Sequence, residues 1–481
     1  MAGHQFMKSN LDKNTLKEVL DLALKNGGDF ADIFIEHKTT TGIMAEGDKI
    51  ERVHSGLDAG AGIRVLAGDS TVYAYTSDLR PQGLRSAARA VTQAVQAGKK
   101  EYNLDLSTVK PVVDFHFEER PDEVDTSCKA EAVLAADRAA REVDKELIKQ
   151  VIITYGDTIQ QVVIANSAGE YVEDERIRTR LTVQAIAAEG EVIQTGYEAT
   201  GSLAGFDLLV RYLPEDLGRA AATRAVKMLK AKPAPAGRMP VVMAGEAGGT
   251  MVHEACGHGL EADLVQKKLS VYAGKKGEQV ASEQVTVIDD VTIKDRYGSY
   301  RYDDEGVPAR KTVLIEDGIL TDYLYDRLTA GKEGRQSNGH GRRESYRHKP
   351  IPRMGNTYIA PGKMPPEKII RETKRGLLVK KMGGGQVNTT NGDFVFEVAE
   401  GYLIEDGEIG TLVRGATLAG NGPEVLKIIE MIGWDLGFTI GTCGKDGQGV
   451  PVSDAQPTIA IKELVVGGTS HGNQNGKICR L

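Results

Sequence analysis

Residues 253–259 bring together side-chain types that could bind and use a metal ion. His253, Glu254, Cys256 and His258 lie in this one short segment. Two imidazoles that bracket a glutamate are close to the His-Glu-x-x-His pattern, in which both imidazoles hold zinc and the carboxylate activates a water molecule. The segment follows an apolar run at 239–244 that predicts a buried strand, and Thr250 is the expected N-cap of a helix that begins here.

The spacing of the two histidines departs from that pattern, because His258 follows His253 by five positions rather than four. On a regular helix, four steps return to within about 40° of the starting direction, whereas five steps end about 140° away. Both rings can face one ion only if the segment widens by one residue or ends near His258. We expect Gly257 and Gly259 to permit such a break.

A hydrolytic zinc site commonly takes three protein ligands, so two imidazoles leave the set one short. The candidates for the third ligand are Cys256, Cys443, Glu261 and Asp263. Cys256 lies inside the motif, where chain geometry makes coordination together with both histidines awkward. Cys443 is flanked by glycines that let the backbone fold tightly around a ligand, and spacing alone ranks it only slightly above the two carboxylates.

The elements that must position these residues alternate between helical and strand periodicity. Helices are expected near 14–26, 81–98, 129–146 and 215–230, with short strands at 31–37, 41–45, 50–54, 60–66, 70–75, 151–155, 160–165, 177–188 and 191–200. A Pro/Ala/Gly stretch at 232–237 is typical of a linker. We therefore divide the chain into an N-terminal α+β domain (1–232) and a C-terminal β-rich domain (239–481).

The predicted fold class is α+β, with helices packed on antiparallel sheets in the first domain and a glycine-rich, β-dominated second domain that carries the metal site. Hairpin turns are expected at 47–48, 68–69, 317–318 and 405–407, where glycine and aspartate separate alternating apolar runs. One amphipathic helix is expected near 423–431.

One polar stretch, 331–353, is the marked positive cluster of the chain. Two interpretations are open: a solvated loop, or a basic wall that holds a substrate carboxylate or a developing oxyanion. The stretch carries Arg335, His340, Arg342, Arg343, Arg347, His348 and Arg353.

Composition excludes several classes of protein. With 481 residues and a net charge of −8, the chain is not expected to bind nucleic acid or an anionic membrane by general electrostatics. No apolar run reaches the roughly 18 residues of a membrane span, and the first residues lack the apolar core of a secretion signal, so we expect a cytoplasmic protein. Four cysteines are too few for a disulfide framework, and Cys128 and Cys479 are expected to be inert buried thiols.

Four separate motifs, in this order along the chain, are similar to those of the TldD/PmbA metalloproteases, and of the TldD branch in particular. The motifs are HEACGHGLE (253–261), GHGRRESYRH (339–348), PRMGNTY (352–358) and GTCGKDGQ (441–448). The resemblance implies that His253, His258 and Cys443 hold one zinc ion per chain and that Glu254 is the general base. Cys256 adds a thiol beside this set, and we hypothesise that it makes the site sensitive to oxidation.

The resemblance also implies a substrate and a partner. Family members are linked to leader-peptide removal and antitoxin degradation, so we expect unfolded or extended peptide substrates and a dimer, either with a PmbA/TldE-like subunit or with a second copy. The first domain would then supply dimerisation and the substrate cleft. Arg343 and His348 are candidates for binding the substrate at the developing oxyanion.

The alternative function is a non-enzymatic regulatory subunit, of the DNA gyrase modulator type, with a structural metal. Structural zinc usually fills all four positions with protein groups, whereas this chain offers three ligands beside Glu254. The enzyme is therefore the favoured prediction.

Overall fold

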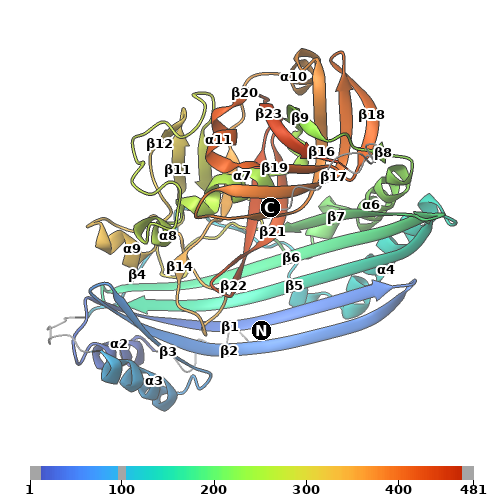
Figure 1. Ribbon diagram of the computed structural model, residues 1–481. Coiled ribbons are helices and arrows are strands. Elements are labelled where there is room, and N and C mark those ends of the chain that lie inside the picture. The colour runs from blue at the N-terminus through green and yellow to red at the C-terminus, as the bar shows by residue number, and fades with distance from the viewer. Residues whose placement is uncertain (1–11, 96–103, 469–481) are drawn as a thin grey trace.

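The computed structural model describes residues 12–95 and 104–468. Its first half is built on one long, twisted sheet (Figure 1) of seven strands in the order β3-β2-β1-β5-β6-β4, with β7 also paired to β6. All pairs are antiparallel except β4 with β6. The strands are β1 (Phe30–Glu46), β2 (Lys49–Ala67), β3 (Ser70–Thr76), β4 (Ser107–Thr108), β5 (Ile148–Asn166), β6 (Glu170–Glu189) and β7 (Val192–Ser202).

The strands are longer than the sequence predicts, and the separate runs expected at 31–37 and 41–45 are one strand. β1 keeps its pairing with β2 from Phe30 to Glu46 and with β5 from Asp32 to Glu46. Backbone hydrogen bonds to a neighbour on each side carry the strand across the polar residues 38–41, where the apolar alternation fails. The division into short strands was therefore wrong, because pairing rather than side-chain pattern decided strand length.

Helices flank this sheet at its two ends, with α2 and α3 at one end and α4 and α6 at the other (Figure 1). α2 (Lys13–Ala23) and α3 (Pro81–Ala94) share an apolar core with β1 to β3, and α4 (Thr126–Val143) and α6 (Pro214–Leu229) share another with β5 and β6. Both cores include side chains of β1 at odd-numbered positions, which lie on the same face of the strand. Asp12 caps α2, since its Oδ1 accepts from the Thr15 N–H at 2.7 Å.

The second half of the chain lies on the opposite face of the sheet (Figure 1). Phe34, Ile164 and Val172 of the sheet pack there against Tyr302 and Tyr346. This junction buries a set of paired charges as well as apolar side chains, among them the ion pair of Arg176 with Asp304. It therefore fixes the orientation of the second half on the sheet.

Two large sheets and one two-stranded sheet make up the second half within the described residues. The first has six strands: β12 (Ile319–Leu320), β11 (Lys311–Glu316), β10 (Val287–Asp290), β15 (Asn356–Ile359), β22 (Gln448–Gln456) and β21 (Gly437–Lys445). The second closes on itself, because pairing of the first and last strands completes a ring of β16 (Arg375–Val387), β9 (Gly237–Met243), β23 (Ile459–Gly467), β19 (Thr417–Asn421) and β17 (Asp393–Glu405). A closed ring leaves no free edge among these strands.

Further elements attach to these sheets. β18 (Glu408–Arg414), β8 (Lys232–Pro233) and β20 (Ile429–Ile432) extend the second sheet beyond the ring, and β13 (Gly341–Arg342) pairs with β14 (Ile351–Pro352). The connecting helices are η1 (Pro121–Glu123), α5 (Leu208–Arg211), η2 (Gly245–Ala247), α7 (Thr250–Val252), η3 (His253–Gly257), η4 (His258–Leu260), α8 (Ala262–Gln266), α9 (Arg327–Lys332), α10 (Pro366–Glu372) and α11 (Gly422–Lys427).

The predicted α+β class and the predicted hairpin turns are confirmed. Strand pairs β1–β2, β2–β3, β11–β12 and β17–β18 meet at these turns, which contain residues with positive φ such as Asp48, Gly68, Asp317 and Gly407. The helix expected at 423–431 is shorter, because α11 ends at Lys427 and residues 429–432 pair with β23 as strand β20. In the described ranges, no helix has the length and apolar character to cross a bilayer.

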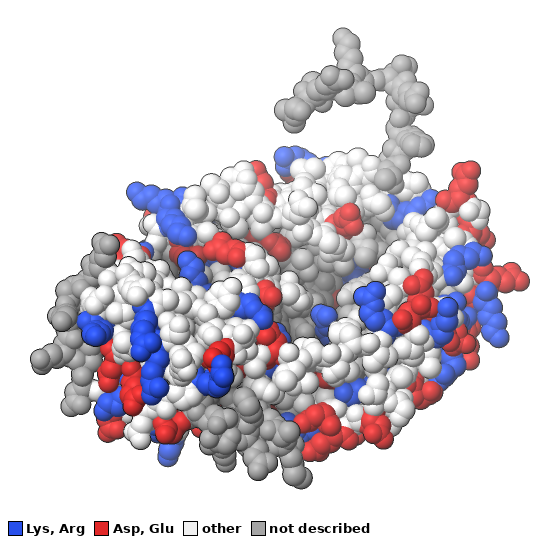
Figure 2. All heavy atoms as spheres, turned by 90° about the horizontal axis from the view of Figure 1, so that it is seen from below, with Lys and Arg blue, Asp and Glu red and all other residues white. Residues whose placement is uncertain are grey.

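Part of the positive stretch 331–353 is buried and not solvated, whereas residues 331–334 and Arg347 are exposed. His340, Arg342, Arg343 and Arg353 are at most 4% exposed, and their side chains bond to carboxylates, backbone carbonyls and neighbouring side chains. Burial of an arginine requires such partners, and the folded chain supplies them from distant segments. On the face shown in Figure 2, the Lys and Arg side chains of the described residues are interspersed with Asp and Glu, so that face presents no continuous basic patch.

Candidate metal centre

The helix that carries the two histidines widens as the spacing requires. Residues His253–Gly257 form one turn of π-helix, in which the N–H of His258 donates to the carbonyl of His253, five positions earlier. A π-turn adds one residue to a helical turn, so residues five apart lie on the same side. The predicted widening is confirmed, but Gly249 rather than Thr250 occupies the N-cap position.

The glycines act through close packing and not through an unusual backbone conformation. Gly257 has an ordinary helical φ of −52°. A Cβ there would lie 2.0 Å from Sδ of Met354, and a Cβ on Gly249 would lie 2.1 Å from the backbone N of Ala455. Both contacts are far below van der Waals distance. Absence of a side chain therefore lets the helix lie directly against β22 and the Met354 side chain.

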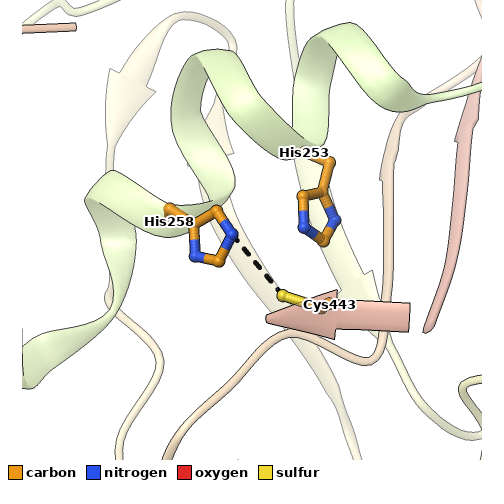
Figure 3. A group of neighbouring side chains, drawn as sticks. All are labelled: His253, His258 and Cys443. Carbon is orange, nitrogen blue, oxygen red and sulfur yellow. Dashed lines mark hydrogen bonds between the residues drawn. The ribbon is translucent and has the colours of Figure 1, made fainter. Parts of the chain in front are cut away.

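The structure brings His253, His258 and Cys443 together (Figure 3). Their ligand atoms all lie within 4.8 Å of one another, and Nε2 of His258 is 3.5 Å from Sγ of Cys443. The two imidazole rings are nearly perpendicular, with centroids 5.0 Å apart. A tetrahedral zinc ion with ordinary bond lengths separates a nitrogen and a sulfur ligand by about 3.6 Å. The donor set and its spacing therefore fit a zinc ion.

Two buried carboxylates orient the imidazoles. Nδ1 of His253 lies 2.8 Å from Oδ1 of Asp454 on β22, and Nδ1 of His258 lies 3.1 Å from Oε2 of Glu261. An Nδ1–H that donates to a carboxylate leaves Nε2 free to bind a metal. Glu261, one of the candidate ligands, thus contacts His258 instead, and the other carboxylate candidate, Asp263, pairs with Lys445 at 2.6 Å.

The electrostatics of the group suit a thiolate. Burial acts to raise the pKa of the Cys443 thiol, but the charges and hydrogen bonds of His253 and His258 outweigh it and lower that pKa to about 5. Burial likewise acts to lower the pKa of His258, whereas Glu261 and the Cys443 thiolate raise it to about 10. The three groups therefore stabilise the ionised cysteine, the form that binds metals.

Glu254 lines the same cavity as these three residues. The cavity has a volume of about 1450 Å³, and its walls come from β7 and α6 of the first half and from β16, β17, β21 and β22 of the second. Burial raises the pKa of the Glu254 carboxyl, and the neighbouring His253 and His258 lower it in part. A partly buried carboxyl beside a metal site is suited to accept a proton from water.

The two substrate-binding candidates lie elsewhere. Neither Arg343 nor His348 lines this cavity. Arg343 is 3% exposed and donates to the carbonyl of Asp304, and Ser345 Oγ lies 3.0 Å from Nδ1 of His348. Their part in substrate binding stays a prediction.

The remaining cysteines differ from one another. The Sγ of Cys256 lies 3.2 Å from the carbonyl oxygen of Val252, and burial raises the pKa of this thiol to about 12. A buried, protonated thiol reacts slowly with oxidants, which argues against the oxidation hypothesis. Cys128 is exposed on α4 and not buried as expected, and Cys479 lies outside the described residues.

Sequence reasoning missed Asp454, Lys445 and the structural role of Arg353. Arg353 donates to the backbone carbonyls of Cys443 on β21 and Gln448 on β22. Arg353 and Lys445 stand in motifs that the sequence singles out, but nothing in their spacing links them to the metal ligands. Asp454 carries no local signal, because its partner lies 201 positions away.

Comparison with known protein families agrees with this geometry. Three consecutive domains of the PmbA/TldA metallopeptidases match the chain: domain 1 at residues 31–97, the central domain at 119–229 and the C-terminal domain at 236–468. The chain belongs to this family. It is therefore a metalloprotease, and the family resemblance of its four motifs is confirmed.

Curated relatives extend over nearly the whole chain. A metalloprotease TldD homolog of Haemophilus influenzae is 37% identical over 473 residues, which cover 96% of this chain and 98% of the relative. A zinc metalloprotease TldD homolog of Saccharolobus solfataricus is 33% identical over 322 residues, or 67% of this chain and 72% of the relative.

Solved structures share the fold. A Thermotoga maritima protein, described as a candidate modulator of DNA gyrase, has a TM-score of 0.79 and 25% identity, and the match covers 95% of this chain and all of that one. TldE from Thermococcus kodakarensis has a TM-score of 0.74 at 22% identity, with 94% of this chain and all of TldE covered. The latter likeness concerns the fold alone.

Proposed function

We propose that this chain is a zinc peptidase that hydrolyses unfolded or extended peptides. His253, His258 and Cys443 hold one zinc ion in this proposal, and Glu254 is the general base. The observation that carries it is the presence of three clustered donors and a carboxyl of raised pKa on the wall of one cavity. The zinc assignment is further supported by the name of the Saccharolobus relative.

The residues of the site would have separate chemical roles in peptide hydrolysis. A zinc ion bound by these donors would act as a Lewis acid on the scissile carbonyl and would acidify a water molecule. Glu254 accepts the proton of that water and delivers it to the leaving amine. Its raised pKa brings it closer to neutral pH, where one carboxyl can act first as base and then as acid. Asp454 and Glu261 hold the imidazoles in the required tautomer.

The cavity supports an extended peptide as substrate. A volume of about 1450 Å³ with walls from both halves of the chain exceeds the roughly 300–1,000 Å³ of ordinary small-molecule sites. In this proposal the domains are 1–232 and 239–481, and the first supplies dimerisation and the substrate cleft, in keeping with the residues of β7 and α6 on the cavity wall. A PmbA/TldE-like subunit or a second copy is the proposed partner, in keeping with the fold shared with TldE.

The test is hydrolysis of an unfolded protein by the wild-type chain and by Glu254→Gln, alone and together with a PmbA/TldE-like subunit. Loss of a general base costs about 10²–10⁴-fold in rate, so the variant should lose cleavage but retain zinc. Glu246→Gln is the control, because Glu246 lies on the nearby η2, is not among the residues that line the cavity, and has a side chain that is 60% exposed where it pairs with Lys380. Unchanged hydrolysis by Glu254→Gln would contradict its role.

The alternative, a non-enzymatic binding subunit with a structural metal, predicts a different result. A wild-type chain that retains zinc but cleaves nothing, alone or with the partner, would support it. Membership of a metallopeptidase family and the carboxyl beside the donor set favour the enzyme.

A further inference from the structure

Lys445 occupies an unusual position for a lysine. Its side chain is 7% exposed and lies between two carboxylates, with Nζ 2.6 Å from the half-buried Asp263 and 3.1 Å from the buried Glu261. A third contact joins Nζ to the carbonyl of Pro352 at 3.0 Å. The three donor positions of the ammonium group are therefore matched by three acceptors, which offsets the desolvation of this buried charge.

The same strand carries a proposed metal ligand. Cys443 and Lys445 are two positions apart on β21, so both side chains leave the same face of the strand. Cys443 lies beside Nε2 of His258, and Lys445 contacts the carboxylate that binds Nδ1 of that ring. One strand thus contacts both ends of the same imidazole, at one end directly and at the other through Glu261.

The contacts of Glu261 are concentrated on one oxygen. Oε2 is close to both His258 Nδ1 and Lys445 Nζ, whereas Oε1 is buried without a hydrogen-bond partner among the described residues. An ammonium group can only donate, so any atom that faces Lys445 must be an acceptor. The atom that faces Lys445 is also the one that faces His258. An acceptor that the lysine holds in this place leaves His258 Nδ1 as the donor and Nε2 as the free ligand atom, and the choice between acceptor and donor becomes real when an amide replaces the carboxylate.

We propose that Lys445 is a positioning residue that fixes Glu261 as hydrogen-bond acceptor for His258 and so holds the ring in its metal-binding tautomer. The inference rests on the proposed function, because it takes His258 as a zinc ligand. The carboxylate beside His253 has no corresponding lysine: within the described part of the chain, the ion-pair partner of Asp454 is His253 itself. The two imidazoles are therefore held by different means.

The difference between Glu261, which contacts a lysine, and Asp454, which does not, can be tested with one variant at each carboxylate. Glu261→Gln and Asp454→Asn each remove one negative charge beside a ligating ring, but they differ in what orients the new amide. In Glu261→Gln, Lys445 turns the amide oxygen toward itself, and hence toward His258. In Asp454→Asn, nothing comparable prevents the amide nitrogen from facing His253 and imposing the wrong tautomer.

The measurement is zinc affinity by chelator competition, with the melting temperature of the zinc-free protein as a control for folding. Asp454→Asn should weaken zinc binding by about 10–100-fold and Glu261→Gln by less than ~10-fold. Glu261→Gln combined with Lys445→Met should again lose about 10–100-fold relative to Glu261→Gln alone, and Lys445→Arg in that background should restore affinity. In the cobalt-substituted protein, the ligand-field spectrum should change in the same order.

Equal losses for Glu261→Gln and Asp454→Asn, or no further loss on adding Lys445→Met, would overturn the inference. Lys445→Met alone leaves two carboxylates without their cation and could unfold the region, so the comparison uses the Glu261→Gln background. The variant His258→Ala distinguishes a failure of the proposed zinc-ligand set from a failure of the proposed role of Lys445. If His258→Ala binds zinc normally, the ligand set of the proposed function is wrong; if it loses zinc while the other variants do not, only the role of Lys445 is refuted.

Discussion

Substitution of Gly249 by alanine tests whether helix packing on β22 positions His253. A Cβ at this position would lie 2.1 Å from the backbone N of Ala455 and 2.3 Å from the carbonyl carbon of Asp454. The φ of Gly249 is −91°, which alanine adopts freely, so the steric contact is the whole effect. The contacted atoms belong to the backbone of β22, which cannot relieve the contact by rotating about a side-chain bond. The helix must therefore retreat by about 1.3 Å to bring the closest contact to the 3.4 Å of ordinary packing.

A helix displacement of about 1.3 Å would disrupt the hydrogen bond that orients His253. The hydrogen bond from His253 to Asp454 is 2.8 Å long, and moving the helix away from β22 stretches it beyond hydrogen-bonding range. We expect zinc affinity to fall by about 10–100-fold and peptide hydrolysis by ~10²-fold, with a loss of about 1–3 kcal/mol in unfolding free energy from overpacking.

The assay compares zinc affinity by chelator competition, hydrolysis of an unfolded protein and denaturant unfolding for Gly249→Ala and wild type. Gly331→Ala is the control, because no atom lies within 4 Å of the position its Cβ would take. Wild-type zinc affinity and hydrolysis in Gly249→Ala would show that the position of His253 does not depend on this packing.

Two further predictions concern buried titratable groups. Because burial raises the pKa of the Cys256 thiol to about 12, Cys256→Ala should leave zinc content, hydrolysis and peroxide sensitivity unchanged, and protection from peroxide in this variant would contradict that expectation. Burial, together with the charge of Glu305, raises the pKa of Asp326 to about 7 and that of Asp303 to about 8. The folded chain thus binds protons that the unfolded chain, with carboxyl pKa values near about 4, has already released. The free energy of unfolding should therefore decrease as pH rises from about 4 to 8, and Asp326→Asn, which can still cap α9, should flatten this slope in denaturant titrations; an unchanged slope would count against it.

Local signals predicted much of the fold. Two-residue turns of glycine and aspartate marked the hairpins, because their positive φ values are accessible mainly to those residues. Helical periodicity marked α2, α3, α4 and α6 to within a few residues. Strand lengths were not predictable in this way, since β1 and β2 persist through polar residues by pairing with their neighbours.

The local part of the candidate metal centre follows from the sequence alone. A five-residue spacing between His253 and His258 requires a widened helix if both rings are to face one ion, and chain geometry leads to that conclusion. Tertiary structure was needed to show which of the other donors lies beside the two rings. Cys443 reaches His258 across 185 positions because β21 pairs with β22 and β22 with β15, against which the helix packs. Asp454 and Lys445 arrive by the same hairpin. Sheet register, which depends on contacts between distant segments, therefore decided the roles of these residues.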